Sequence, residues 1–462
     1  MMKLWLGILA TLVLASTSTE AALAAKGSAT LRLRYEQFDT PSGNPALDQQ
    51  FGGFHARLRL KGAAWHGSWS IQGTLQGAAT QSLPENGAFG INPVYLAAND
   101  GDTDPGKLSL LEGYVSGHGD SWDLKLGRQS FAEGAELKTG VKYLDGVAKA
   151  RLAERLIGNW DWVNVGRRYD GVRLGAKAED SRIEAFYMQP LAGGVNYKEA
   201  HEWLDDLQLY GVTMSSVREG LFPTTLVRGS VFRYEDERPG AINATGDEVD
   251  VWTVVGSILG GSKGSDALVW VAGQFGDWGN DDHSAWAVIV EVGKRLSDVK
   301  GKPQVRVGYA QASGDDGTDG DHTSFFNVLP TNHKFYGRMD YNAFSNLRNL
   351  YAIASFTPTQ STSVRLAAHT YLLVERTDAW YGGSGAFNEN VLGYAARRPA
   401  SGTFRNRGIG QEVDVDITHT INGNLKTMLG GGFFRADQAA DEVLTHDGDG
   451  YWGYLQVVAN VN

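Results

Sequence analysis

The sequence predicts an all-β protein, namely a transmembrane antiparallel β-barrel of about 18 strands. Segments of about ten residues alternate apolar and polar side chains, as in SATLRLRYEQ (28–37), HARLRLK (55–61) and EVDVDITH (412–419). The connections between these segments are short and long in regular succession. Beyond the N-terminus, no segment approaches the roughly 18 consecutive apolar residues of a membrane-spanning helix. A tilted strand of this length crosses a bilayer with one face toward lipid and one toward an aqueous lumen.

The first residues, MMKLWLGILATLVLASTSTEAALAAKG, have the pattern of a secretory signal peptide. Lys3 is the basic start, 4–15 is the apolar core, and Ala22-Leu23-Ala24 is a small-x-small cleavage site. The alternative is a membrane anchor, for which the apolar core is short. We expect a cleaved signal peptide at 1–24 and a single barrel domain at 25–462, exported to the bacterial outer membrane.

The composition narrows the function classes. The 462 residues include no cysteine, which excludes thiol catalysis, thiolate metal sites and stabilising disulfides. The net charge of -11 argues against a nucleic-acid partner. The mean hydropathy of -0.28 suits a barrel with a polar lumen and polar loops, and 59 glycines and 11% aromatic residues fit bends and interfacial belts. The expected partners therefore include outer-membrane lipid and exclude nucleic acid.

The alternation predicts strands, in chain order, at 29–38, 54–64, 67–77, 107–116, 120–130, 169–178, 180–190, 204–216, 223–234, 246–258, 265–276, 284–296, 303–313, 348–358, 361–374, 409–420, 424–435 and 450–461. Connections after even-numbered strands are tight, as at 117–119, 359–360 and 421–423, the last with the hairpin dipeptide Asn-Gly. Connections after odd-numbered strands are mostly long, as at 78–106, 131–168, 314–347, 375–408 and 436–449. Outer-membrane barrels have short periplasmic turns and longer external loops, so both termini are expected on the periplasmic side.

Segment 143–162 fits either a strand or a short helix. We place it in a long loop, because a strand there would reverse the side of every later turn. The alternative for the whole chain is a soluble all-β protein, such as a propeller or a sandwich. A propeller would show an internal repeat of roughly 40–50 residues, and the sequence shows none.

Charged residues follow the alternation of the first two strands. Leu31, Leu33 and Tyr35 share one face of the first strand, and Arg32 and Arg34 share the other with Glu36. An arginine that faces lipid at mid-depth costs roughly 2–4 kcal/mol, so the charged face should line the lumen. The same parity selects a set of basic lumenal residues: Arg32, Arg34, Arg57, Arg59, Lys61, Arg173, Arg306, Arg365 and Lys426. The acidic lumenal residues cluster on one strand, at Glu412, Asp414 and Asp416.

These cations indicate a conduit for an anionic solute, since rings of Arg and Lys select anions and low-dielectric walls focus their field. The alternative is a lumen in which each arginine forms a salt bridge with a neighbouring carboxylate and so fixes the pairing register of the strands. No nucleophile has a suitable His or Asp partner, and the ten histidines show no metal-ligand spacing. We therefore expect no enzyme, no cofactor and no metal site. The acidic segment 313–321 lacks the terminal Glu of a calcium-binding loop, which leaves calcium binding there an open question.

Several segments in order resemble the alginate-export family of outer-membrane barrels. They are Leu126–Gln129, Trp162 with Gly166–Arg173, Gly308–Asp315, Phe325–Pro330, Asn332–Asp340, Asn349, Gly410–Asp414 and Gly430–Phe433. The resemblance implies an 18-stranded barrel with an arginine-rich constriction that passes a polyuronate. It implies that Arg128 is a constriction residue, with Arg57 or Arg59, Arg306 and Arg365 as further basic lumenal positions. Alternation places Arg128 toward lipid, so we expect a bulge at Gly127 to turn it inward.

The sequence thus predicts an outer-membrane porin that passes an anionic solute, most directly an alginate-like polyuronate, with periplasmic export partners. The alternatives are a general or small organic-anion porin, a barrel that sheathes a partner protein such as an electron-carrying cytochrome, and an outer-membrane enzyme acting on lipid or polysaccharide. The last needs a nucleophile or a carboxylate pair at the external rim, and no residue stands out for that role.

Overall fold

The computed structural model describes residues 24–39, 50–83, 98–238, 248–318, 320–383, 394–444 and 448–461. Residues 1–23 of the expected signal peptide lie outside the described residues. The strands are β1 (Ala24–Asp39), β2 (Gln50–His66), β3 (Trp69–Gln81), β4 (Gly106–His118), β5 (Trp122–Gln129), β6 (Tyr169–Ala178), β7 (Ser181–Pro190), β8 (Leu207–Arg218), β9 (Thr224–Asp236), β10 (Val249–Gly261), β11 (Ser265–Trp278), β12 (Asp281–Arg295), β13 (Gln304–Ala312), β14 (Asp321–His322), β15 (Leu347–Phe356), β16 (Thr362–Leu373), β17 (Trp380–Gly383), β18 (Tyr394–Arg397), β19 (Gly408–Thr420), β20 (Leu425–Ala436) and β21 (Gly450–Val461). The helices are α3 (Lys142–Arg151) and α4 (Gln438–Asp441).

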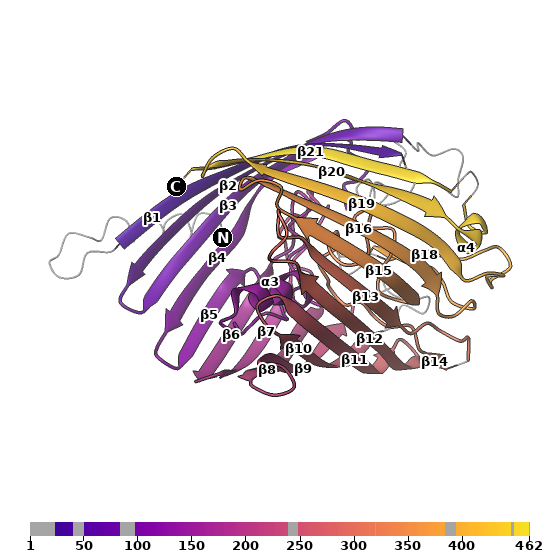
Figure 1. Cartoon of the computed structure of the whole chain (residues 1–462), viewed down its shortest axis with the longest axis horizontal. Coiled ribbons are helices and arrows are strands. Elements are labelled where there is room, and N and C mark those ends of the chain that lie inside the picture. The colour runs from indigo at the N-terminus through magenta and orange to yellow at the C-terminus, as the bar shows by residue number, and fades with distance from the viewer. Residues whose placement is uncertain are drawn as a thin grey trace.

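The strands close into a barrel. β1 pairs with β2 on one side and with β21 on the other, so the first and last strands join (Figure 1). The sheet has 19 strands, but β14 is a two-residue strand that adds in parallel to β12, and β17 and β18 form a separate hairpin. The wall therefore has 18 strands, each antiparallel to both neighbours, which confirms the predicted fold class.

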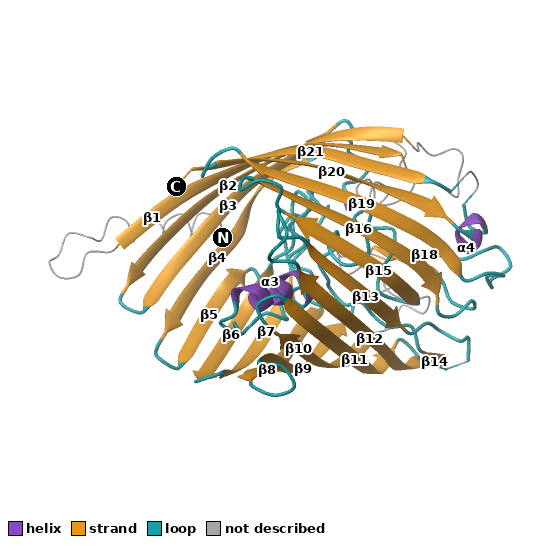
Figure 2. Ribbon diagram, in the orientation of Figure 1, coloured by secondary structure: helices purple, strands orange, loops and turns teal. Residues whose placement is uncertain are grey.

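The connections alternate in length as predicted, with one exception. Short turns follow β2, β4, β6, β8, β10, β12, β15 and β19 at one end of the barrel, and most connections at the other end are long (Figure 2). The exception at the long-loop end is the turn Gly279-Asn280 between β11 and β12. The rule for outer-membrane barrels predicts that the short-turn end faces the periplasm.

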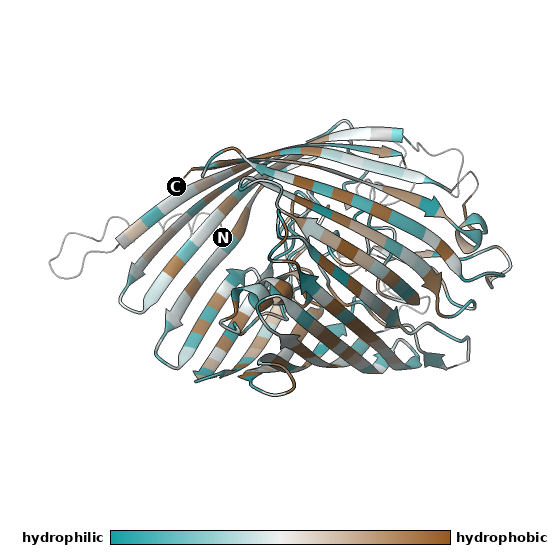
Figure 3. Ribbon diagram, viewed as in Figure 1, coloured by the Kyte–Doolittle hydropathy of each residue, from teal (hydrophilic) through white to brown (hydrophobic). Residues whose placement is uncertain are grey.

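The alternation of side chains separates an apolar outer surface from a charged inner one. Leu33 on β1 is 48% exposed, whereas Arg32 and Arg34 beside it are each 4% exposed. Val305 and Val307 likewise flank the buried Arg306. Figure 3 shows apolar and polar bands alternating along the strands. The predicted lumenal parity is therefore correct for β1, β2 and β13.

Two long loops fold into the barrel. The first inward loop is 130–168 and carries α3, and the second inward loop is 313–346. Leu144 and Val147 of α3 belong to one apolar cluster with Val251, Leu259 and Ile289 from the inner faces of β10 and β12. Those strand faces are apolar and would meet water without the loop, so the loop buries them. The helix lies within the segment predicted to be a loop with helical potential (Figure 1).

Among the described residues, no helix combines the length and the apolar character needed to cross a membrane.

Candidate functional site

The two inward loops bind each other inside the barrel. The amide of Leu329 donates to the carbonyl of Leu156 (2.8 Å), and the amide of Gly158 donates back to the carbonyl of Leu329 (2.9 Å). The pair Ile157 and Leu329 thus forms an isolated parallel bridge, and the amide of Thr331 donates to the carbonyl of Glu154 (3.0 Å) beside it. Segments more than 150 residues apart in sequence thus form one unit within the lumen.

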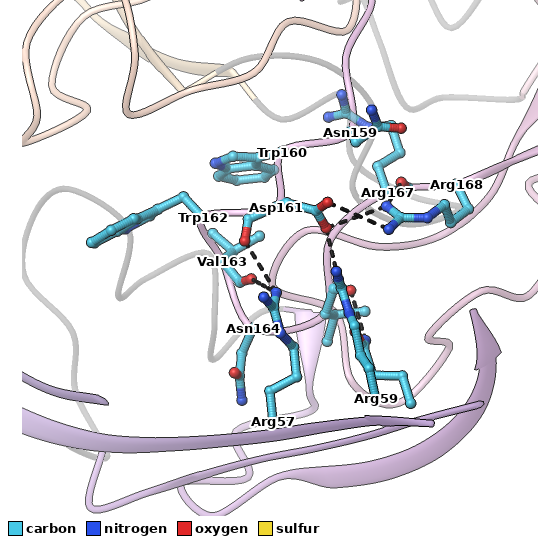
Figure 4. A network of polar contacts seen from close by, with 12 residues as sticks. Arg57, Arg59, Asn159, Trp160, Asp161, Trp162, Val163, Asn164, Arg167 and Arg168 are labelled. Atoms are coloured by element: carbon cyan, nitrogen blue, oxygen red, sulfur yellow. Dashed lines mark hydrogen bonds and ion pairs between the residues drawn. The ribbon is translucent and has the colours of Figure 1, made fainter. Parts of the chain in front are cut away.

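Arginines of the barrel wall hold the first inward loop. Arg32 on β1 donates to the carbonyls of Asp161 (3.1 Å), Trp162 (2.8 Å) and Val163 (3.0 Å) and to the side chain of Asn164 (2.9 Å). Arg57 on β2 donates to the carbonyls of residues 161 (3.1 Å) and 163 (3.3 Å), as Figure 4 shows. Planar guanidinium groups carry several donors in a fixed geometry, which suits a row of carbonyls. The structure thus places these predicted path cations on the lumenal face but beneath the loop.

The Asp161 carboxylate forms ion pairs with two further arginines at the same point. It lies 2.7 Å from Arg59 and 3.3 Å from Arg168 (Figure 4). Enclosure by the barrel would by itself raise the pKa of Asp161, but the guanidinium groups of Arg168, Arg59 and Arg57 hold it well below its usual range. Asp161 therefore stays ionised and neutralises part of the arginine cluster.

Carboxylates on β19 hold the second inward loop in a complementary way. Glu412 accepts hydrogen bonds from the amides of Arg338 (2.6 Å) and Met339 (2.9 Å). Asp416 lies 3.0 Å from the Arg338 guanidinium and 3.4 Å from that of Arg365. Asp414, between them, is fully buried, and its carboxylate has no hydrogen-bond donor in the described part of the chain. The predicted acidic cluster thus lies on the lumenal face, where two of its members position loop 313–346.

A basic chamber occupies the lumen between α3 and strands β12, β13, β15 and β16. Its volume is 860 Å³. Its charged lining, among the described residues, consists of cations alone: Lys142, Arg151, Lys263, Arg295, Arg306, Lys334, Arg338 and Arg365. A second cavity of 390 Å³ shares Arg295, Arg338 and Arg365 with it and adds Lys302 and Asp416. Lys263 and Lys302 belong to short turns, so the chamber lies toward the short-turn end.

Some of the chamber cations are paired and others are not. Glu291 lies 2.8 Å from Arg151 and 3.1 Å from Arg306, and Asp266 lies 2.7 Å from Arg306. A second group is exposed and forms no ion pair within the described ranges: Lys142, Lys263 and Arg295 in the chamber, with Lys302 in the adjoining cavity. The chamber therefore presents uncompensated positive charge to its contents.

The other predicted lumenal cations, Lys61, Lys426 and Arg173, line neither the chamber nor the first inward loop. Lys61 and Lys426 share the parity of lumenal neighbours and are exposed near short turns. Arg173 lies 3.5 Å from Glu184 and 3.9 Å from Asp123, as a salt-bridged lumen would predict.

The prediction that a bulge at Gly127 turns Arg128 inward is wrong. The pairing of β5 with β4 and with β6 runs unbroken through Leu126, Gly127 and Arg128. Arg128 therefore stays on the outer face with Leu126 and binds Asp170 through two hydrogen bonds of 2.9 Å. Gly127 has φ of +118°, and a Cβ there would lie 2.5 Å from the Gly113 carbonyl. Close approach of the two backbones explains the glycine without a change of register.

The alternation missed most of the chamber cations, namely Lys142, Arg151, Lys263, Arg295, Lys334 and Arg338, and also Lys302 of the adjoining cavity. Arg295 shares the inward parity of Glu291 and lies inside the predicted strand 284–296, so the alternation could have identified it. Lys334 and Arg338 lie within the segment 332–340 that resembles the alginate-export family. Lys263 and Lys302 lie in short turns, where neither the strand alternation nor the family resemblance identifies them.

A closed 18-stranded antiparallel barrel, with an apolar exterior and a charged, loop-lined interior, defines the class of outer-membrane porins. The profile of the family described as alginate export matches residues 29–444, and the chain belongs to that family. A comparison with curated proteins gives no match.

Solved structures share the fold at low identity. The chain is similar to OccK9 (OpdG) of Pseudomonas aeruginosa, with 13% identity over 95% of this chain and 98% of that chain and a TM-score of 0.59. It is also similar to OccAB3 of Acinetobacter baumannii, with 12% identity, 95% and 99% coverage and a TM-score of 0.57. A third similar structure is OpdK of Pseudomonas aeruginosa with vanillate, with 11% identity, 94% and 98% coverage and a TM-score of 0.55.

Proposed function

We propose that this protein is an anion-selective porin whose charge selectivity arises in the basic chamber. The observation that supports the proposal is the 860 Å³ cavity whose charged lining, in the described ranges, is entirely cationic. Rings of Arg and Lys favour anions in a pore, and the low-dielectric wall of a barrel focuses their field. A local excess of cations can therefore dominate selectivity although the whole chain carries a net charge of -11.

This proposal moves the selective region away from Arg32, Arg34 and Arg57. Those guanidinium groups are buried and donate to loop carbonyls, so they have little contact with a solute. Arg306 and Arg365 remain in the path because both line the chamber. Cations spaced along the chamber provide several weak sites, which lets an anion enter without being trapped.

We propose a carboxylate-bearing solute as the cargo, in first place an alginate-like polyuronate or its fragments. The family description and the series of chamber cations support a chain of carboxylates. A small organic anion is the second candidate, because the inward loops fill part of the lumen, and the cavity that they leave beside β1 and β21 measures only 20 Å³. OpdK with vanillate is an example of a structurally similar protein with such an anion. The same filled lumen argues against a sheath for a partner protein.

Reversal potentials in planar bilayers under a salt gradient test the anion selectivity. The parent should prefer chloride over potassium, and the double variant Arg295→Ala/Lys302→Ala should lose much of that preference, because it removes two exposed cations that form no ion pair with any described residue. The matched control is Arg128→Ala, which removes a cation from the outer face and should leave selectivity unchanged. Cation selectivity in the parent would refute the proposal.

Blockade of the single-channel current distinguishes the two cargo classes. Oligouronates of increasing length are compared with simple carboxylates at equal carboxylate concentration. Block that strengthens with oligomer length supports a polymer path, because successive carboxylates then occupy successive cationic positions. Block by simple carboxylates alone supports a small organic-anion porin.

A further inference from the structure

Beyond the chamber, the lumen narrows at Trp162. The cavity of 390 Å³ and a further cavity of 20 Å³ share Trp162 and Arg338 as lining residues. The smaller cavity continues along β1 and β21, past Phe38 and Trp452, toward the long-loop end. A space of that size holds about one water molecule. The route along the β1–β21 wall is therefore constricted where the indole ring lies.

Both faces of the Trp162 ring are covered. The guanidinium carbon of Arg34 lies 3.8 Å from the ring centroid on one face. The imidazole of His333 stacks on the ring with a centroid distance of 3.8 Å and an interplanar angle of 9°. Tyr454 and Trp452 meet the indole edge-on at 4.9 Å and 5.8 Å. Because no face is open, the ring is an obstacle to a solute and not a surface on which the solute stacks.

The backbone of Trp162 is also fixed. Its carbonyl accepts hydrogen bonds from Arg32 (2.8 Å) and Arg34 (2.5 Å), and the carbonyls on either side accept from Arg32 and Arg57. All these donors are on the rigid strands β1 and β2. The indole is thus held against the wall by residues that do not belong to its own loop.

We infer that Trp162 sets the size limit for solutes along the β1–β21 wall, separately from the charge selection in the chamber. The inference rests on the proposed porin function. The indole carries no charge, so its removal should widen the route and leave the field of the cations in place. Arg34 would keep its bonds to Gln456 (2.9 Å) and Glu36 (3.2 Å) and to the backbone carbonyl of residue 162.

The test compares the parent with Trp162→Ala in two assays. The first is single-channel conductance, which should rise in the variant. The second is swelling of proteoliposomes in neutral sugars of increasing size, from arabinose through glucose and sucrose to raffinose. The variant should admit sugars that the parent excludes, while its anion-to-cation permeability ratio stays at the parent value. The matched control is Trp286→Ala, which removes an exposed indole from the outer face and should change neither quantity.

Trp162→Phe provides a second variant with a smaller ring, for the case in which the alanine variant does not reach the folded, heat-modifiable form. It should give an intermediate conductance and an intermediate sugar cut-off. Parent-like conductance and cut-off in a folded Trp162 variant would overturn the inference. A cation-selective parent whose Trp162 variants nevertheless admit larger sugars would refute the proposed anion selectivity and support the size filter.

Discussion

Arginines of the same parity have different roles here because different elements cover them. Arg32 on β1 is buried beneath the first inward loop, and its Nη1 and Nη2 groups donate to carbonyls of that loop. Arg295 at the end of β12 is exposed in the chamber and has no ion pair among the described residues. A buried guanidinium that is satisfied by carbonyls is structural, whereas an exposed unpaired one can attract a solute anion.

Asp416→Asn should strengthen anion selectivity. The Asp416 carboxylate neutralises Arg338 (3.0 Å) and Arg365 (3.4 Å), both of which line the chamber. The isosteric amide removes one negative charge and leaves both cations without that partner. The reversal potential in a salt gradient should shift further toward chloride, and Asp180→Asn in a distant exposed turn should cause no shift. A shift toward potassium would contradict the assignment of the chamber as the selective region.

The contact between the second inward loop and Trp162 should depend on pH through two residues. Burial raises the pKa of Asp340 to about 8, against the hydrogen bond from the His333 amide and the charge of Arg338, and Glu36 and Asp414 add smaller increases. Burial, together with Arg338 and Arg34, lowers the pKa of His333 well below its usual range. In an opened loop the pKa values would return to about 4 for Asp340 and about 6.5 for His333.

The sign of the effect follows from proton linkage. Between pH ~4 and ~6.5, rising pH has two opposite effects on the contact between the second inward loop and Trp162. The contact weakens because Asp340 must stay protonated in it, and it strengthens because His333 must stay neutral in it. Between pH ~6.5 and ~8 only Asp340 responds, and the closed contact weakens. Current fluctuations in bilayers should therefore increase over that upper range. Asp340→Asn, which keeps an oxygen to accept from the His333 amide (2.5 Å), should remove the increase. The same increase in this variant would contradict the assignment.

At the scale of elements, the first inward loop depends on the wall arginines for its position. Arg32→Met should destabilise it, because three loop carbonyls and the Asn164 side chain lose four hydrogen bonds from one guanidinium. Arg34 and Arg57 still donate to these carbonyls, so the loss is that of hydrogen bonds from a charged donor, which contribute roughly 1.5–3 kcal/mol each. The free energy of unfolding should therefore fall by about 3 kcal/mol. Urea unfolding in lipid vesicles measures the change. Lys61→Met, on the same face of the neighbouring strand but exposed, should have little effect, and equal losses in both variants would contradict the anchoring role.

The strands could be predicted from the sequence because their signal is local. Alternation of Leu31 and Leu33 with Arg32 and Arg34 identifies both the strand and its lumenal face within a few residues. The inward loops could not be predicted in this way. The contact of Arg32 with Trp162 spans 130 positions, and that of Glu412 with Met339 spans 73. Only the closed barrel brings these groups together.

Arg128 shows the limit of a resemblance at a single position. The family motif implied an inward guanidinium, and the alternation implied an outward one. The unbroken register of β5 with its neighbours agrees with the alternation. The outward arginine is tolerated because Asp170 neutralises it, and the exposed Trp203 donates to the same carboxylate (2.6 Å). The local pattern was more reliable than the motif for orientation, whereas the motif region 332–340 contained two chamber cations that the pattern missed.

At the scale of the whole molecule, the inner wall of the barrel combines an apolar region and a charged region. The inner faces of β10 to β12 are apolar and bury α3, whereas β1, β2 and β19 present charges that hold the two loops. The basic chamber lies between these regions. Its position is therefore set by the docking of both loops and not by the barrel wall alone, which connects the stability of the loops to the proposed selectivity.

The outer surface offers a direct test of membrane insertion. Val290 lies near the middle of β12, opposite Val269 and Tyr309, and is 45% exposed on the outer face. Val290→Arg should lower the free energy of unfolding in lipid vesicles by about 2–4 kcal/mol, the cost of an arginine at the bilayer midplane. Val299→Arg makes the same exchange at an exposed position in the β12–β13 turn, where the cost falls to about 0–1 kcal/mol near the interface. Urea titration of both variants gives the comparison. Equal losses would mean that β12 does not lie across the hydrocarbon, and the outer face would then need another explanation for its valines and leucines.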